Sequence, residues 1–165
     1  MANMFLDLTN IAGESLDHDH EGKIEVHDWS WGMHNHAPFS ITAGDKAAKH
    51  ARFTHITIHK RIDRSTPTLM QYCAHGMKIP EGTLICRKND GDKQIEYLTI
   101  KLKEVKVYEV DWPLKGGDDV ETIMLAFHKV HVEYTVQTNE GDLDKNPKGS
   151  TLFDFNIPDP DDVSE

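Results

Sequence analysis

Two closely spaced pairs of histidines are the first feature of this sequence to suggest chemistry. The chain has 11 His, which include the motifs His18-x-His20 and His34-x-His36. Imidazole is a common ligand of transition metals, and cupin-like barrels take their ligands from an HxH motif followed four residues later by Glu. After His36 the chain reads Ala-Pro-Phe-Ser-Ile, so that Glu is missing. We therefore predict no metal site and interpret these imidazoles as surface and strand-facing groups.

The possible nucleophiles lack the neighbours that catalysis needs. Ser30 lies in Trp-Ser-Trp-Gly and not in the Gly-x-Ser-x-Gly turn of hydrolases. Cys73 falls on a helix face that we expect to be buried, and Cys86 alternates within a strand, so both are interpreted as core thiols. No glycine-rich phosphate loop opens a helix. We predict no catalytic residue, no cofactor and no enzymatic activity.

Length and charge limit the classes of protein. The chain has 165 residues and a net charge of −10, and its basic residues are interleaved with acidic ones. This charge argues against nucleic-acid binding, which needs clustered Lys and Arg. We predict a single domain over 1–156 and an acidic C-terminal tail over 157–165.

The N-terminus, Met-Ala-Asn-Met-Phe-Leu-Asp-Leu, has neither the basic start nor the apolar run of a signal peptide. The sequence also has no apolar run long enough to span a membrane as a helix, so we expect no membrane insertion. Cys73 and Cys86 form no CxxC pair and no disulfide framework. We expect folding in a reducing cytoplasm, and export, if it occurs, by a machine that needs no signal peptide.

The elements that would position any site are predicted to be mainly β-strands. Three long strands each show one slip in the alternation of buried and exposed residues, which is what a β-bulge produces. Such slips imply sheets that bend and close, so we predict a compact closed β-barrel of two antiparallel sheets. The slips fall near His27-Asp28, near Lys103-Glu104 and within Thr122 to Val136, and further strands are expected over Met4 to Leu8, Phe53 to Lys60 and Ser150 to Phe155.

One short α-helix, about 66–75, is predicted to flank the barrel. Thr66 is a suitable N-cap, Pro67 suits the first helical position, and Gly76 is the expected residue after the helix. Further along the chain, Asn89-Asp90-Gly91-Asp92 predicts a hairpin between strands over Thr83 to Arg87 and Gln94 to Leu102.

The long extended loop at about 32–51, which we call the arm, is the better functional candidate. Loops beyond about 12–15 residues without secondary structure are usually functional or disordered, and Phe39 and Ile41 make this one too apolar for a disordered linker. The arm either folds back on its own barrel or protrudes and buries these side chains against a neighbouring subunit. For the second alternative the predicted interface residues are Phe39, Ile41, Thr42, Ala43, Gly44, Asp45 and Lys46.

Over nearly its whole length the chain resembles the Hcp family, the tube-forming proteins of bacterial type VI secretion systems. The matching residues occur in the family's order and include Trp29-Ser30-Trp31-Gly32, Gly44-Asp45-Lys46-Ala47, Asp63 to Leu69 and Tyr97 to Leu102. Phe153 departs from the pattern, because many members have Trp at this position.

The resemblance implies a secreted, non-catalytic subunit that assembles into hexameric rings, which stack into the inner tube. It implies further partners in the sheath, baseplate and spike of the machine, and small effectors that can travel in the ring lumen. The protein would be cytoplasmic before firing and would then reach the extracellular space or a target cell. Two alternatives stay open: a metal-dependent cupin-like barrel enzyme, and a monomeric ligand-binding barrel.

Overall fold

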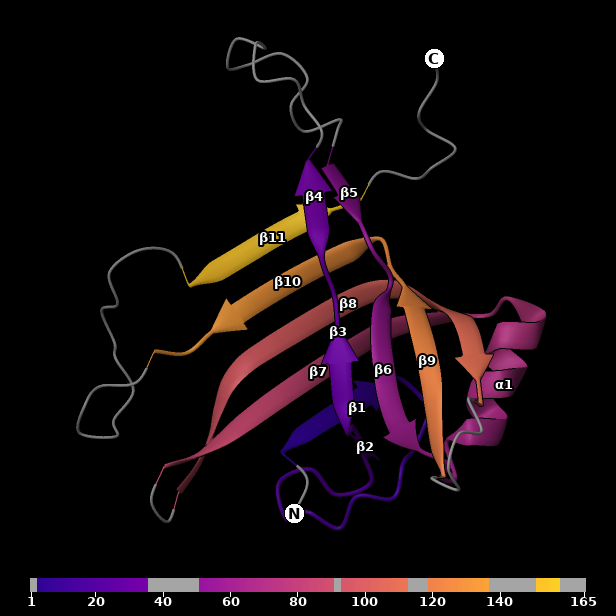
Figure 1. The fold of residues 1–165 in the computed structure, drawn as a ribbon, viewed down its shortest axis with the longest axis horizontal. Coiled ribbons are helices and arrows are strands. Elements are labelled where there is room, and N and C mark those ends of the chain that lie inside the picture. Colours follow the sequence, from indigo (N-terminus) through magenta and orange to yellow (C-terminus); the bar gives the residue numbers. More distant parts are fainter. Residues whose placement is uncertain (1–2, 36–50, 91–92, 113–118, 137–150, 158–165) are drawn as a thin grey trace, which may run out of the picture.

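The computed structural model describes residues 3–35, 51–90, 93–112, 119–136 and 151–157, and these residues form one helix and eleven strands (Figure 1). In chain order the elements are β1 (Met4–Leu8), β2 (Ile24–Glu25), β3 (Asp28–Ser30), β4 (Met33–Asn35), β5 (Ala51–Phe53), β6 (Ile56–Arg61), α1 (Thr66–His75), β7 (Lys78–Asp90), β8 (Lys93–Asp111), β9 (Val120–Ala126), β10 (Lys129–Tyr134) and β11 (Leu152–Asn156). The prediction of a mainly β fold with one short flanking helix is confirmed.

Nine of the strands form one sheet, in which every pairing among the described residues is antiparallel. The order is β2-β1-β7-β8-β9-β6-β3, and β10 pairs with both β8 and β11. The remaining two strands, β4 and β5, form a small ladder of their own. Strand pairing in the described residues therefore does not close the sheet into a barrel, which differs from the predicted closed form.

The two ends of this sheet are nevertheless consecutive in the chain. β2 pairs with β1 and β3 pairs with β6, and only two residues separate β2 from β3. The backbone N–H of Val26 donates to the Met4 carbonyl at 3.0 Å, whereas that of His27 donates to the His59 carbonyl at 2.8 Å. The predicted slip near His27-Asp28 is therefore the point at which this segment passes from one end of the sheet to the other.

β8 is the longest strand and bends in its middle. Its first half pairs with β10 and its second half with β9. The change of partner falls at the predicted slip, where Glu104 has a φ of 54°, a conformation that non-glycine residues rarely adopt. The slip predicted within Thr122 to Val136 lies opposite this bend, where β9 ends and β10 begins.

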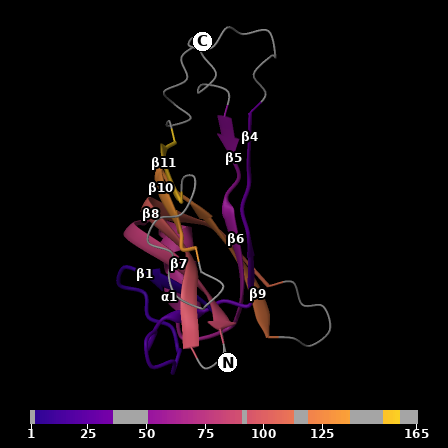
Figure 2. The same cartoon turned by 90° about the vertical axis from the view of Figure 1, so that its left-hand side faces the viewer.

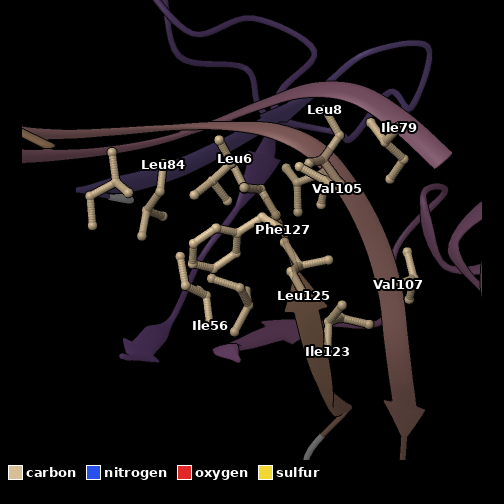
Figure 3. Close-up of a cluster of buried hydrophobic side chains, with 14 of the residues drawn as sticks. Leu6, Leu8, Ile56, Ile79, Leu84, Val105, Val107, Ile123, Leu125 and Phe127 are labelled. Carbon is tan, nitrogen blue, oxygen red and sulfur yellow. The ribbon is translucent and has the colours of Figure 1, made fainter. Parts of the chain in front are cut away.

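The hydrophobic core lies on the concave side of the bent sheet. Figure 3 shows its side chains turned toward one another; they come from β1, β6, β7, β8 and β9, and from Phe127 directly after β9. Alternation within each strand supplies them, as in the burial pattern of β9, where every second residue is buried. The labelled members are Leu6, Leu8, Ile56, Ile79, Leu84, Val105, Val107, Ile123, Leu125 and Phe127.

Helix α1 packs beside β8 through Leu69, Tyr72 and Cys73. It ends as predicted at Gly76, whose φ of 60° is the left-handed conformation in which glycine costs least. The predicted N-cap was wrong by one residue: Ser65 is the cap, and Thr66 begins the helix.

A buried ion pair lies beneath the first turn of α1 and forms a hydrogen bond with Thr66, the first residue of the helix. Lys60 Nζ and Glu121 Oε1 are 2.6 Å apart, and both side chains are fully buried. The Thr66 hydroxyl donates to Glu121 Oε1 at 2.7 Å, and the Trp112 indole donates to Oε2 at 2.8 Å. Lys60 also pairs with Asp63 at 2.7 Å. This network joins β6, β9 and the start of α1.

A second buried ion pair lies on the outer face of the sheet, under the loop that joins β1 to β2. Arg87 Nη1 donates to Asp17 Oδ1 at 3.0 Å, and the guanidinium lies 4.6 Å from the centre of the Phe5 ring. His20 stacks on the same ring at 4.4 Å. Because the Lys23 ammonium can only donate, the 3.1 Å contact with His20 Nδ1 places the imidazole proton on Nε2.

Two groups of this cluster, Asp17 and His20, have lowered pKa values. The hydrogen bond from Arg87 lowers the pKa of Asp17 below its ordinary 3.8. Burial, followed by the nearby Lys23 charge, lowers the pKa of His20 below its ordinary 6.5. In each case the unfolded chain binds a proton before the folded one does, so the free energy of unfolding falls as the pH falls through that window.

We therefore expect acid to destabilise the protein in two steps at this cluster, one below pH 6.5 and one below pH 3.8. His20→Gln is expected to remove the first contribution and Asp17→Asn the second. Urea unfolding followed between pH 8 and pH 3 measures both. A His20→Gln profile parallel to that of the wild type between pH 7 and pH 5 would contradict this assignment.

Candidate assembly surface

The arm leaves the sheet on the β4–β5 ladder, in which Met33 faces Phe53 and Asn35 faces Ala51. Figures 1 and 2 show both strands continuing away from the nine-stranded sheet. Met33, His34 and Asn35 are all exposed. These three side chains are therefore not buried against the sheet, which favours the protruding alternative.

Thr54 fixes the place where the arm begins. Its backbone N–H and its hydroxyl both donate to the Gly32 carbonyl, at 3.0 and 3.1 Å. In return, the Gly32 N–H donates to the Thr54 hydroxyl at 3.0 Å. The Trp31 indole donates to the Thr54 carbonyl, also at 3.0 Å. The two sides of the arm are thus tied together at its root.

A chain of aromatic rings anchors this root to the sheet. The ring centre of Trp31 lies 5.8 Å from that of Phe127, in an edge-on arrangement, and 6.2 Å from that of Phe53, in a stacked one. Phe53 contacts Phe155 at 4.7 Å, and Phe155 stacks with Phe153 at 6.2 Å. Ring pairs at such distances stabilise beyond the area they bury. The aromatic chain therefore connects the arm to β11, a strand about a hundred positions later in the sequence.

The predicted interface residues, Phe39, Ile41, Thr42, Ala43, Gly44, Asp45 and Lys46, lie outside the described residues. Both ends of the segment that carries them are described, at Asn35 and Ala51, which face each other across the β4–β5 ladder. Their role at a subunit interface stays a prediction.

Strand edges offer a second kind of surface. Within the described part of the chain, β11 pairs only with β10 and β3 pairs only with β6. The exposed side of such a strand presents backbone donors and acceptors that another chain can pair with or cover.

A hollow of about 710 Å³ lies at the far end from the arm, between the β1–β2 loop and the end of β6. Its apolar members include Leu16 and Ile62, which are 92% and 42% exposed. Glu14, Glu25 and Asp63 are among its acidic members. Because Leu16 and Ile62 line one hollow together, their exposed apolar surface is grouped, which makes the hollow a candidate contact site.

The histidines form no metal cluster in the part of the chain that the structure describes. No three His, Cys, Asp or Glu side chains gather there as metal ligands would. His18 is exposed and pairs with Asp19 at 3.1 Å, and His34 is exposed on β4, while His36 lies outside the described residues. No helix among the described residues is long and apolar enough to cross a membrane.

Sequence reasoning missed two parts of this surface. Leu16 was not predicted, because a single leucine between polar residues gives no alternation to interpret. Phe153 and Phe155 were assigned only to a last strand, although their spacing of two residues indicates a shared face. That spacing was the available signal for their packing against the arm.

The sequence of this chain matches one protein family over most of its length. Residues 5–134 match the family model described as "Type VI secretion system effector, Hcp". Protein hcp1 of Pseudomonas aeruginosa is 38% identical over 147 residues, which cover 88% of this chain and 90% of that protein.

Solved structures agree in fold. A type VI secretion system effector from Yersinia pestis has a TM-score of 0.73 and 26% identity, and the match covers 93% of this chain and 99% of that one. Hcp1 from Salmonella typhimurium has a TM-score of 0.71 and 28% identity, over 95% and 96% of the two chains.

The sequence match and the shared mainly β fold point to the same class, the Hcp-type proteins of type VI secretion. The chain belongs to the Hcp family of type VI secretion proteins.

Proposed function

We propose that this protein is the subunit of a type VI secretion tube, and that six copies form a ring by head-to-tail contacts in which the arm of one copy binds the next. The observation that supports this best is the anchored, outward-directed root of the arm. Thr54, Trp31 and the aromatic chain hold the two ends of the arm, while Met33, His34 and Asn35 beyond this root are exposed.

Fixing the root of the arm lowers the entropy cost of binding at such an interface. Ordering a long loop on binding costs conformational entropy, and this cost is smaller when both ends are already fixed. A head-to-tail interface joins two different surfaces of the same chain and closes when the rotation between copies allows it. The exposed edges of β11 and β3 and the hollow around Leu16 are candidate receiving surfaces.

Three finer parts of the proposal concern shape and context. The domain, 1–156, acts as a barrel that the segment Ile24 to Ser30 closes by bonding to both ends of the sheet. The tube works with a sheath, baseplate and spike, and small effectors can travel in its lumen. The protein resides in the cytoplasm until the machine fires.

Phe39→Asp and Ile41→Asp are each expected to weaken ring assembly by at least tenfold while leaving the fold intact, because both place a charge in the proposed apolar contact. Light scattering on a sizing column measures the assembly, and a mass near six times 18.8 kDa is expected for the wild type. Far-UV circular dichroism checks the fold. Met77→Asp introduces the same charge at an exposed apolar residue beside the helix and is the matched control.

Unchanged ring mass in both arm variants would contradict the role of the arm but not the ring itself. A monomeric wild-type protein at all concentrations would contradict the ring and favour a monomeric binding barrel. A loss of assembly in Met77→Asp equal to that in the arm variants would show that added charge alone disperses the ring, and would remove the evidence for the arm.

A further inference from the structure

A basic groove runs across the outer face of β8, β10 and β11. Lys101 and Lys103 on β8 lie beside His131 and Lys129 on β10, and Asp154 and Asn156 on β11 complete the row. Alternation puts all six on the face opposite the core. They line a hollow of about 460 Å³.

The charges of this groove are only partly balanced by the described residues. His131 Nδ1 lies 2.6 Å from Asp154 Oδ1. Lys103 lies 3.6 Å from Glu81, with both side chains largely exposed. Lys101 and Lys129 form no ion pair with any described residue. A positive strip of this kind is unexpected in a chain whose net charge is −10, and it calls for an anionic occupant.

The sequence supplies such an occupant immediately after the groove. The segment 158–165 carries Asp159, Asp161, Asp162 and Glu165 and no basic residue. The chain is still bonded to the sheet at Ile157, whose N–H donates to the His128 carbonyl at 2.6 Å. Asn156, one residue earlier, already lines the groove. The acidic segment therefore begins at the rim of the basic strip.

The distances allow the segment to reach the groove of its own chain. Crossing from β11 over β10 to β8 takes two strand spacings, about 10 Å, and moving from the level of Lys103 to that of Lys101 takes about 7 Å more. An extended segment of eight residues spans up to about 26 Å. Pro158 and Pro160 suit the turn that this path needs, since proline fixes φ and requires no hydrogen-bonded N–H.

We propose that residues 158–165 bind in the groove formed by Lys101, Lys103, Lys129 and His131 of the same chain. Exposed charge pairs are individually weak, but a short tether gives an effective concentration in the millimolar range, so a millimolar intrinsic affinity suffices for about half occupancy. The bound segment covers the strip and denies it to the acidic surface of a second copy. This binding does not depend on the proposed ring.

Zero-length carbodiimide cross-linking tests the proposal, because it joins carboxylates to amines only where they touch. Light and ¹⁵N-labelled full-length chains are unfolded together, refolded and cross-linked in low salt, and the linked peptides are identified by mass spectrometry. We expect links from the acidic segment to Lys101, Lys103 or Lys129, predominantly within one chain. We expect 0.5 M NaCl to reduce their yield at least fivefold, since it screens exposed charges.

Lys101→Gln/Lys129→Gln is expected to lower the remaining yield, to Lys103, at least threefold. Lys78→Gln/Lys106→Gln removes two exposed lysines that face each other elsewhere on the β7–β8 pair and should leave the links unchanged. Predominantly light–heavy links would overturn the proposal in favour of a second copy as the occupant. Links spread equally to Lys78 and Lys106, or no links at all, would overturn it as well.

Discussion

Glu121→Ala is expected to lower the free energy of unfolding by about 3–5 kcal/mol, the cost of leaving one charge of a buried pair without its partner. The Lys60 ammonium, which is fully buried, would lose the carboxylate at 2.6 Å and keep only Asp63 as an ionised partner among the described residues. The Thr66 hydroxyl and the Trp112 indole would lose their acceptors at the same time. Urea unfolding at pH 7 measures the loss.

A double-mutant cycle separates the ion pair from the space that its side chains fill. Lys60→Met/Glu121→Leu replaces both charges with apolar groups. We expect this double variant to lose at least about 1 kcal/mol less unfolding free energy than Lys60→Met and Glu121→Leu lose together as single variants. Glu81→Ala removes the exposed partner of Lys103 and is expected to cost less than about 1 kcal/mol. Strict additivity in the cycle would show that the two charges do not stabilise each other.

Gly13→Ala is expected to cost about 3 kcal/mol or more, because the backbone leaves no room for a side chain there. A Cβ at this position would overlap the Lys23 carbonyl oxygen and lie 2.5 Å from the Ile24 Cα. The Gly13 N–H also donates to the Gly22 carbonyl at 2.8 Å. Relieving the clash would move the β1–β2 loop away from β2 and uncover Phe5.

Gly32→Ala is the matched control for this substitution. The nearest atom to its Cβ would be the Thr54 hydroxyl oxygen at 4.0 Å, so we expect a change below about 1 kcal/mol. Hydrogen exchange of the β1–β2 loop should rise in Gly13→Ala and stay constant in Gly32→Ala. Equal stability of the two variants would mean that the loop adapts without cost.

Local signals predicted the elements that depend on local chemistry. Pro67 and Gly76 place the helix, because one fixes φ and the other tolerates the left-handed conformation. The Asn89-Asp90-Gly91-Asp92 hairpin joins β7 and β8, although both strands are longer than predicted. The slip near Lys103-Glu104 was found from alternation alone, since the buried residues change phase there, between Leu102 and Val105. It is a bend rather than the expected bulge, because the β7–β8 register continues through it.

Alternation could not name the partners of each strand. The segment Thr122 to Val136 was predicted as one strand, but it forms β9, which pairs with β6, and β10, which pairs with β11. The alternation of buried and exposed residues shows where the phase changes, but not whether the strand also changes its neighbours. For the same reason, alternation could not predict how the sheet closes: strand pairing does not close it, and the segment through Val26 and His27 bonds to both of its ends.

The sequence indicates the two members of the buried ion pair but does not indicate that they pair with each other. Lys60 continues the inward row of Ile56 and Ile58, and Glu121 begins the inward row of Ile123 and Leu125. A charge in such a row is stable only beside an opposite charge. Pairing the two residues, however, requires the β6–β9 register, in which they lie directly opposite each other. The assembly surface is similar: the sequence located the arm, but not the rings of β11 that anchor it.

The aromatic chain at the root of the arm also sets an order of events during synthesis. Phe53 leaves the ribosome early, but its partner Phe155 follows about a hundred residues later. At the roughly 5–20 residues per second of translation, this interval lasts about 5–20 s. Until then the root of the arm lacks half of its aromatic support. In the proposed ring, this would disfavour recruitment of a chain whose synthesis is incomplete.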